Sequence, residues 1–207
     1  MLDPTTEDAA NRTKQALGNG LRCVCLFPAM QRYSLHDPRV NKVIDSVASH
    51  PGAAVFVHCG ALSVGVRKKL GLPSRFDVSR GSPLDVQPLA ADYPTVPFVI
   101  PHFGAGLLRE ALLLADLCSN VHLDTSSSNK WLAYHPGLTL DAVFRQALEV
   151  AGSDRVLFGT DSSFFPRGWN RAVYDAQLQA LDAAGVQADA RDRVLGGNFD
   201  RLFPRPA

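Results

Sequence analysis

Five short apolar runs, separated by longer amphipathic stretches, dominate the pattern of hydrophobic and polar positions along the chain. They lie at residues 21–27, 53–57, 97–101, 121–125 and 156–158. A short, nearly continuous apolar run is typical of a strand that is buried on both faces of a parallel sheet. The pattern therefore predicts about five parallel strands.

The stretches between these runs carry apolar residues at helical spacing. Helices are predicted at residues 5–17, 38–49, 106–118, 139–150, 170–184 and 190–195. Asp37 is the expected N-cap of the second helix, because a proline follows it at the first helical position. Residues 62–86, with scattered Gly and Pro, form the longest irregular connection, which is either a binding element or a surface excursion.

The alternation of strands and helices predicts right-handed crossovers and an α/β fold. A doubly wound nucleotide-binding sheet is not indicated, since no G-x-G-x-x-G and no G-x-x-x-x-G-K-[ST] motif is present. A complete (β/α)₈ barrel needs eight strands and about 250 residues. The chain, with 207 residues and no linker or repeat, is predicted to be a single domain, 1–207, that is too short for a complete barrel.

Polar side chains follow three of the predicted strands. His58 comes directly after residues 53–57, His102 follows 97–101, and Asp161 lies just past 156–158. Because functional residues of parallel α/β folds gather beyond the carboxyl ends of the strands, we expect these three side chains to converge. Asp124 also ends a strand and is interpreted as a cap for the Ser-rich turn that follows.

Composition and charge give no indication of a nucleic-acid or membrane partner. The chain is 46% hydrophobic and 20% charged, with a net charge of +1, and no basic stripe indicates nucleic-acid binding. No apolar run reaches membrane-spanning length, and the first residues lack the pattern of a signal peptide. The four cysteines, two of them (Cys23 and Cys25) poorly placed for a disulfide on one strand, fit a reducing compartment. We therefore expect a cytoplasmic protein with a small-molecule substrate and no nucleic-acid or membrane partner.

Five sequence blocks resemble the amidohydrolase superfamily, in particular the amidohydrolase-related branch that includes the aminocarboxymuconate-semialdehyde decarboxylase-like enzymes. They are F-V-H-C-G (56–60), V-I-P-H-F-G-A-G (99–106), V-H-L-D-T-S (121–126), R-V-L-F-G-T-D (155–161) and G-G-N-F-D-R-L-F (196–203). Their order and spacing match the family's barrel strands four to eight. The resemblance implies a partial (β/α)₈ TIM-like barrel of about five parallel strands with flanking helices.

The resemblance also implies roles for individual residues. His58 would be a metal ligand, and Asp161 a ligand that also handles the proton of an activated water. His102 would be a ligand or an orienting acid/base residue. Imidazole nitrogen and carboxylate oxygen suit a divalent metal such as Zn²⁺. On the loop after Asp161, Arg167 and Trp169 are candidates for substrate binding, by clamping a carboxylate and stacking on a ring.

One feature of the family is missing: its first strand carries an H-x-H pair, and no H-x-H occurs in this chain. Strands one to three of the family barrel, with two metal ligands, therefore have no counterpart. Three interpretations stay open at this point: a fragment or incorrectly started product of a longer hydrolase, a subunit that pairs with another copy, or a remnant with a decayed site. His58, His102 and Asp161 could still supply three protein ligands, which in number is enough for a catalytic zinc site.

The function predicted from these observations is hydrolysis of a small amide, ester or related carbonyl compound by a metal-activated water. The alternatives are non-oxidative decarboxylation on the same metal centre and a non-catalytic, truncated barrel. An open sheet exposes an apolar edge and interior, so self-association or poor solubility is also predicted.

Overall fold

A five-stranded parallel sheet forms the centre of the protein. The computed structural model describes residues 1–62, 65–162 and 168–204. The strands lie in chain order in the sheet: β1 (Cys23–Leu26), β2 (Ala54–Val57), β3 (Phe98–Ile100), β4 (Val121–Asp124) and β5 (Val156–Leu157). Every pair of neighbours is parallel, with Val24 opposite Val55 and Phe98 opposite Val121 as examples of the register. The predicted partial barrel of about five parallel strands is confirmed.

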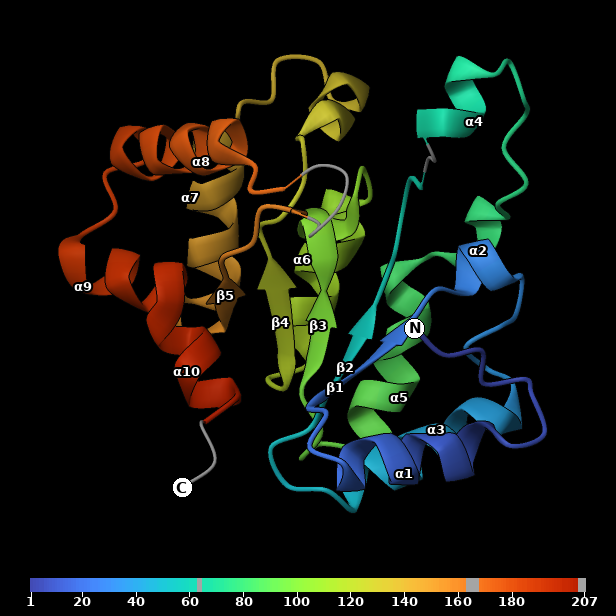
Figure 1. Cartoon of the computed structure of the whole chain (residues 1–207). Helices are drawn as coiled ribbons and strands as arrows, with labels where there is room; N and C mark the ends of the chain where they lie inside the picture. Colours follow the sequence, from blue (N-terminus) through green and yellow to red (C-terminus); the bar gives the residue numbers. More distant parts are fainter. Residues whose placement is uncertain (63–64, 163–167, 205–207) are drawn as a thin grey trace.

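Helices connect the strands (Figure 1). The longer ones are α1 (Ala9–Gly18), α3 (Pro38–Ala48), α6 (Leu108–Leu117), α7 (Leu140–Ala151) and α8 (Arg171–Ala183). Shorter ones are α2 (Pro28–Gln31), α4 (Gly65–Lys69), α5 (Gln87–Asp92), α9 (Ala188–Asp192) and α10 (Asn198–Leu202). Within the described part of the chain, no helix combines the length and the apolar character that crossing a membrane requires.

The start of α3 shows how local sequence sets a helix boundary. The Asp37 carboxylate accepts a hydrogen bond from the Arg39 backbone N–H at 2.9 Å, and Pro38 occupies the first helical position, as predicted. Val40, Val43, Ile44 and Val47 then recur at helical spacing, and all four are buried. This apolar stripe fixes the face of the helix that packs on the sheet.

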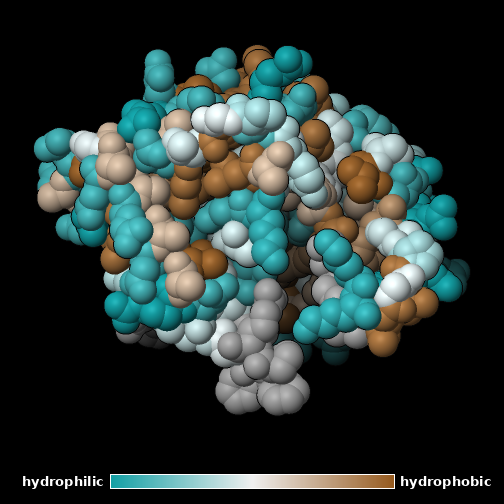
Figure 2. All heavy atoms as spheres, turned by 90° about the horizontal axis from the view of Figure 1, so that it is seen from above, coloured by the Kyte–Doolittle hydropathy of each residue, from teal (hydrophilic) through white to brown (hydrophobic). Residues whose placement is uncertain are grey.

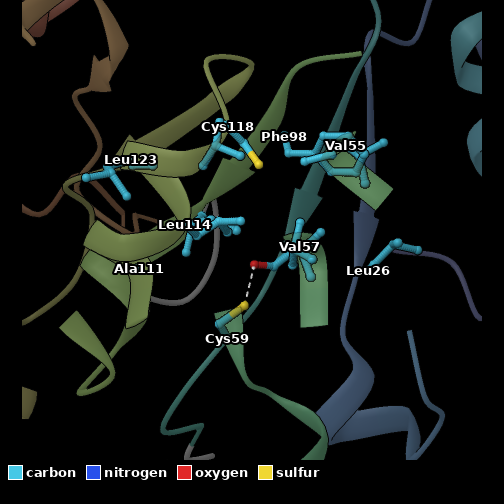
Figure 3. Close-up of a cluster of buried hydrophobic side chains, with 14 of the residues drawn as sticks. Leu26, Val55, Val57, Cys59, Phe98, Ala111, Leu114, Cys118 and Leu123 are labelled. Carbon is cyan, nitrogen blue, oxygen red and sulfur yellow. Dashed lines mark hydrogen bonds between the residues drawn. The ribbon is translucent and has the colours of Figure 1, made fainter. Parts of the chain in front are cut away.

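Alternate residues of each strand point towards the helices and build the core. Leu26, Val55, Val57, Phe98 and Leu123 belong to it, and Figure 3 shows them beside Ala111, Leu114 and Cys118. The thiol of Cys59 is buried there and donates to the carbonyl oxygen of Val57 at 3.5 Å. All four cysteines are free thiols, in agreement with the prediction.

The intervening strand residues lie on the opposite face of the sheet, because side chains alternate along a strand. Val99, His122 and Leu157 on this face are buried, at 4%, 6% and 4% exposure, and Phe56 is half-buried. This face of the sheet is therefore less exposed to solvent than the sequence analysis predicts for an open sheet. At the β1 edge, Leu2 forms a parallel bridge with Leu26 and covers part of the edge. Self-association stays a prediction.

Two connections differ from the sequence-based expectation. The predicted irregular segment 62–86 contains α4 and two 3₁₀ turns, Val78–Arg80 and Pro83–Val86, and α4 lies beyond the carboxyl ends of the strands in Figure 1. Beyond the helix predicted at 190–195, the two glycines of the G-G-N block belong to a π-helical stretch, Arg193–Gly197, that leads directly into α10. The buried Asn198 amide stabilises this path by donating to the carbonyl oxygens of Ser153 and Val156.

Candidate metal-dependent active site

His58, His102 and Asp161 line one cavity at the carboxyl ends of the strands, as the strand-end argument predicts. The cavity has a volume of about 280 Å³. Figure 2 looks down on this end of the molecule and shows a hollow bordered by hydrophilic residues, with hydrophobic residues deeper inside. The three residues follow β2, β3 and β5 and lie up to about a hundred positions apart in the sequence. They line the same cavity because parallel strands end on the same side of the sheet.

His58 is buried at the end of β2, with 4% of its surface exposed. Its ring stacks on Phe27 at a centroid distance of 5.4 Å, and its backbone N–H donates to the Leu26 carbonyl oxygen. Burial lowers the pKa of His58 to about 4, and the nearby His102 adds to the lowering. The Nδ1 atom is buried without a hydrogen-bond partner in the part of the chain described. A neutral imidazole with an unshared nitrogen is what a metal ligand requires.

His102 lies in a left-handed turn after β3. Its φ is 59° and that of Phe103 is 50°, a conformation that costs a non-glycine residue on the order of 1–3 kcal/mol and that clusters at functional sites. The His102 ring lies edge-on to His58 with 5.1 Å between centroids. Its Nδ1 lies 2.7 Å from the Ser126 carbonyl oxygen, which can only accept, so we assign the proton of the neutral ring to Nδ1. The other ring nitrogen then carries the lone pair.

Asp124 links the two loops that hold the His102 ring. Its carboxylate accepts from the Ser126 backbone N–H at 2.9 Å, from the Ser126 hydroxyl, and from the His102 backbone N–H at 3.4 Å. The predicted capping role is therefore confirmed. Burial raises the pKa of the Asp124 carboxyl, while the Ser126 hydrogen bond and the His102 charge oppose that rise. Asp124 thus fixes the position of the His102 turn relative to Ser126.

Just before Asp161, the segment that follows β5 packs closely against the end of β4. A Cβ atom at Gly159 would lie 2.7 Å from Asp124 Oδ2 and 2.8 Å from Ser126 Cβ, so only glycine fits there without a shift of its neighbours. The fully buried Gln177 of α8 donates from Nε2 to the carbonyl oxygens of Thr125, at 3.0 Å, and Gly159, at 2.8 Å. Asp161 itself has a φ of 51° and lines the cavity.

The two predicted substrate-binding residues have different outcomes. Arg167 lies outside the described residues. Trp169 is not part of the cavity lining: it is 59% exposed, and its ring lies 5.8 Å from that of Tyr174 on α8. Its ring packs at an angle of 49° against the ring of this helix residue.

The loop after β4 contributes cavity residues that the sequence analysis missed. They are Ser127, Ser128, Lys130, Trp131 and Tyr134. The polar run S-S-S-N-K directly after a strand end was the signal in the sequence, since such positions line sites in parallel α/β folds. Which of its side chains face the cavity depends on the turn conformation, which the sequence pattern does not specify.

The chemistry of the donor set fits a divalent metal such as zinc, because two imidazoles and one carboxylate surround one cavity. The buried, unpaired Nδ1 of His58 supports this fit. As placed, however, no three His, Cys, Asp or Glu side chains within residues 1–62, 65–162 and 168–204 come together closely enough to hold an ion. The donors are thus of the right kind, and they surround the cavity without converging on one point.

Comparison with protein families gives a match over nearly the whole chain. Residues 1–205 match the family model described as Amidohydrolase (Amidohydro_2). Among curated proteins, the chain is 36% identical over 138 residues to Protein fluG of Emericella nidulans, covering 60% of the chain and 15% of that protein. It is 30% identical over 134 residues to a 2-keto-4-carboxy-3-hexenedioate hydratase of Sphingobium sp., covering 56% of the chain and 36% of the hydratase.

Solved structures share the fold. A 5-carboxyvanillate decarboxylase, LigW, from Sphingomonas paucimobilis aligns with a TM-score of 0.63 at 18% identity, over 99% of this chain and 64% of that one. An amidohydrolase from Burkholderia multivorans with bound zinc aligns with a TM-score of 0.62 at 18% identity, over 99% and 72%. The chain thus spans about two thirds of the length of these structures and much less of the curated relatives. At these identities, the structural likeness shows the fold alone.

Proposed function

Because the chain belongs to the amidohydrolase family, we propose that it is built for metal-dependent attack of water on a small carbonyl compound, such as an amide or ester. The observation that carries this proposal is that His58, His102 and Asp161, from three strands, line one cavity. The zinc bound in the Burkholderia multivorans relative supports the choice of a divalent metal. The names of two relatives, a carboxyvanillate decarboxylase and a carboxy-hexenedioate hydratase, support a carboxylated substrate.

His58 and Asp161 would hold the metal, with His102 beside them. A bound zinc ion supplies Lewis acidity and lowers the pKa of water towards about 7. The neutral state of His58 suits it to this role, because burial already holds its pKa at about 4. The Asp161 carboxylate accepts the proton of the attacking water as the oxygen–carbon bond forms.

His102 handles a proton at the substrate oxygen. Its Nδ1 is engaged with Ser126, so the other ring nitrogen of the neutral ring is an acceptor and cannot donate. Polarisation of the substrate carbonyl by His102 therefore requires the protonated ring, in which both nitrogens donate. The Ser126 carbonyl oxygen stabilises that cation while it fixes the orientation of the ring.

The proposal is tested by the metal content of the purified protein, measured by elemental analysis beside the His58→Ala and Asp161→Ala variants. We expect close to one divalent ion per chain, lost in both variants. His36→Ala is the matched control, because His36 is exposed and its ring lies 3.5 Å from the Asp85 carboxylate, outside the cavity lining. Absence of metal from the unmodified protein, or its retention in both site variants, would overturn the proposal and favour a non-catalytic barrel.

Decarboxylation is the second candidate, supported by the decarboxylase among the structural relatives. The same ligands serve both reactions, so metal content does not separate them. A screen of the metal-loaded protein does: hydrolysis of esters and amides yields a new carboxylate without gas release, whereas decarboxylation of aromatic acids releases CO₂. Activity lost in Asp161→Ala and kept in His36→Ala would assign the observed reaction to this site.

A further inference from the structure

Lys130 is a cation at the cavity that the proposed chemistry does not use. It is the only Lys or Arg among the described residues that line the cavity. It makes no ion pair with another residue of 1–62, 65–162 or 168–204, although nine ion pairs occur elsewhere in that part of the chain. An unpaired ammonium group at a substrate cavity is free to bind an anionic ligand.

The segment that carries Lys130 is firmly docked. Lys130 begins a 3₁₀ turn, Lys130–Tyr134, whose next residue, Trp131, is only 5% exposed and packs near Phe103 with 6.5 Å between centroids. His135 Nε2 lies 3.0 Å from the Gly106 carbonyl oxygen. The backbone of Lys130 is therefore held in place, which reduces the entropy lost when its side chain binds a ligand.

The same contacts connect Lys130 to the catalytic loop. Tyr134 packs so closely on Gly106 that a Cβ there would lie 2.9 Å from its ring. Gly106 and Phe103 flank the turn that carries His102, so the Lys130 turn and the His102 turn form one packed unit. The backbone segments that carry the two side chains consequently keep a fixed relation to each other.

Backbone conformation provides a separate indication. Ser127 has a φ of 139° and Asn129 a φ of 56°, both rare for residues other than glycine. The Ser127 hydroxyl accepts from the Asn129 backbone N–H at 3.1 Å and so stabilises this turn. Strained backbone of this kind is retained where the geometry of a site requires it.

We propose that Lys130 determines specificity by binding a carboxylate of the substrate that is remote from the reacting carbon, while Trp131 and Tyr134 contact its unsaturated skeleton. This rests on the proposed function. Asp161, at the same cavity, repels a carboxylate and Lys130 attracts it, so charge alone orients a carboxylated substrate. The Ser127 and Ser128 hydroxyls provide further hydrogen bonds at the same wall.

Calorimetric titration with benzene-1,3-dicarboxylate tests the proposal, with benzene-1,3-dimethanol as the neutral probe of equal shape. We expect Lys130→Met to weaken dicarboxylate binding roughly ten- to hundred-fold, the range for losing a charge-assisted contact. Binding of the neutral probe is expected to stay unchanged. Lys130→Arg keeps the charge and is expected to bind the dicarboxylate within a few-fold of the unmodified protein. Added salt is expected to weaken dicarboxylate binding to the unmodified protein far more than to Lys130→Met.

Lys14→Met is the matched control, because Lys14 is exposed on α1, away from the cavity. Metal content is measured on every sample, so that failure of the metal site is recognised separately. The inference is overturned if the unmodified protein binds no dicarboxylate, if Lys130→Met binds it unchanged, or if that variant loses the dicarboxylate and the neutral probe equally.

Discussion

His102 Nδ1 lies 2.7 Å from the carbonyl oxygen of Ser126, so a residue after β4 sets the orientation and tautomer of a ring that follows β3. The Ser126 hydroxyl lies 3.0 Å from the same nitrogen. Asp124 holds both partners through their backbone N–H groups. The acid/base residue of the candidate site is therefore positioned by its neighbouring strand as much as by its own.

Removing Asp124 is expected to loosen this arrangement. In Asp124→Ala the Ser126 N–H and hydroxyl and the His102 N–H lose their shared acceptor, and each buried unpaired donor costs about 1–3 kcal/mol. We expect the unfolding free energy in urea to fall by at least about 2 kcal/mol, with faster amide exchange in residues 101–106. Asp116→Ala, at an exposed position of α6, is the control and is expected to change stability by less than about 0.5 kcal/mol. Equal stability of the two variants would contradict the positioning role.

Gly60 is expected to tolerate no side chain. Its φ is +71°, and a Cβ there would lie 2.0 Å from the Gly104 carbonyl oxygen and 2.6 Å from that of Ala105. Gly60→Ala must push apart the loops that follow His58 and His102, so we expect a loss of about 3 kcal/mol or more. At about 2–4 °C per kcal/mol for a chain of this size, Tm falls by at least about 6 °C.

Gly18→Ala serves as the comparison for Gly60→Ala. Gly18 lies at the end of α1 without a positive φ, and a Cβ atom added there would meet no other atom within 4 Å. Its replacement is expected to be neutral or to stabilise by up to about 1 kcal/mol, because alanine favours the helix. A Tm for Gly60→Ala within about 2 °C of the unmodified protein would show that the loops separate without cost.

Gln177 is expected to be a stabilising residue that also affects Asp161. Gln177→Leu removes the amide that bridges the Thr125 and Gly159 carbonyl oxygens and leaves both without that donor in a buried location. We expect a loss of about 2–4 kcal/mol in urea unfolding and weaker metal retention, since Asp161 follows Gly159. Gln179→Leu, on the exposed side of the same helix, controls for the substitution. If Gln177→Leu retains as much metal as Gln179→Leu, the hydrogen bonds of Gln177 do not affect metal binding at Asp161.

His122 is expected to make stability dependent on pH. Burial lowers its pKa from 6.5 to about 4, and the charges of Arg201 and Arg155 add to the lowering. Below pH 6.5 the unfolded chain binds a proton that the folded chain excludes, so the stability from this residue is present above about pH 6.5 and is lost as pH falls towards 4.

The measurement is urea unfolding at pH 7 and at pH 5 for the unmodified protein and His122→Gln. Between these pH values the unmodified protein is expected to lose about 2 kcal/mol more than the variant, because His58 and the other titrating groups are common to both. Identical losses in the two proteins would mean that His122 is protonated in the folded state at pH 5.

Sequence patterns determined the framework of the protein. Apolar runs and amphipathic spacing identified the five parallel strands and most helices. A strand that is buried on both faces needs a continuous apolar run, and a helix that is buried on one face needs apolar residues at helical spacing. The cap at Asp37 and the turn at Asp124 were equally local. The placement of His58, His102 and Asp161 around one cavity also followed, since parallel strands bring their carboxyl ends to one side of a sheet.

Only the tertiary structure decided how this site is completed. Lys130 lines the cavity because Trp131 and Tyr134 dock on residues 103–106, contacts made across a long sequence separation. Trp169 lies outside the cavity lining, with its ring against that of Tyr174 on α8. The proton on His102 Nδ1 follows from the Ser126 carbonyl oxygen on another strand. Loop conformation, close backbone approach and hydrogen-bond partners depend on which segments contact one another in space. The pattern of residue types along the chain does not specify those contacts.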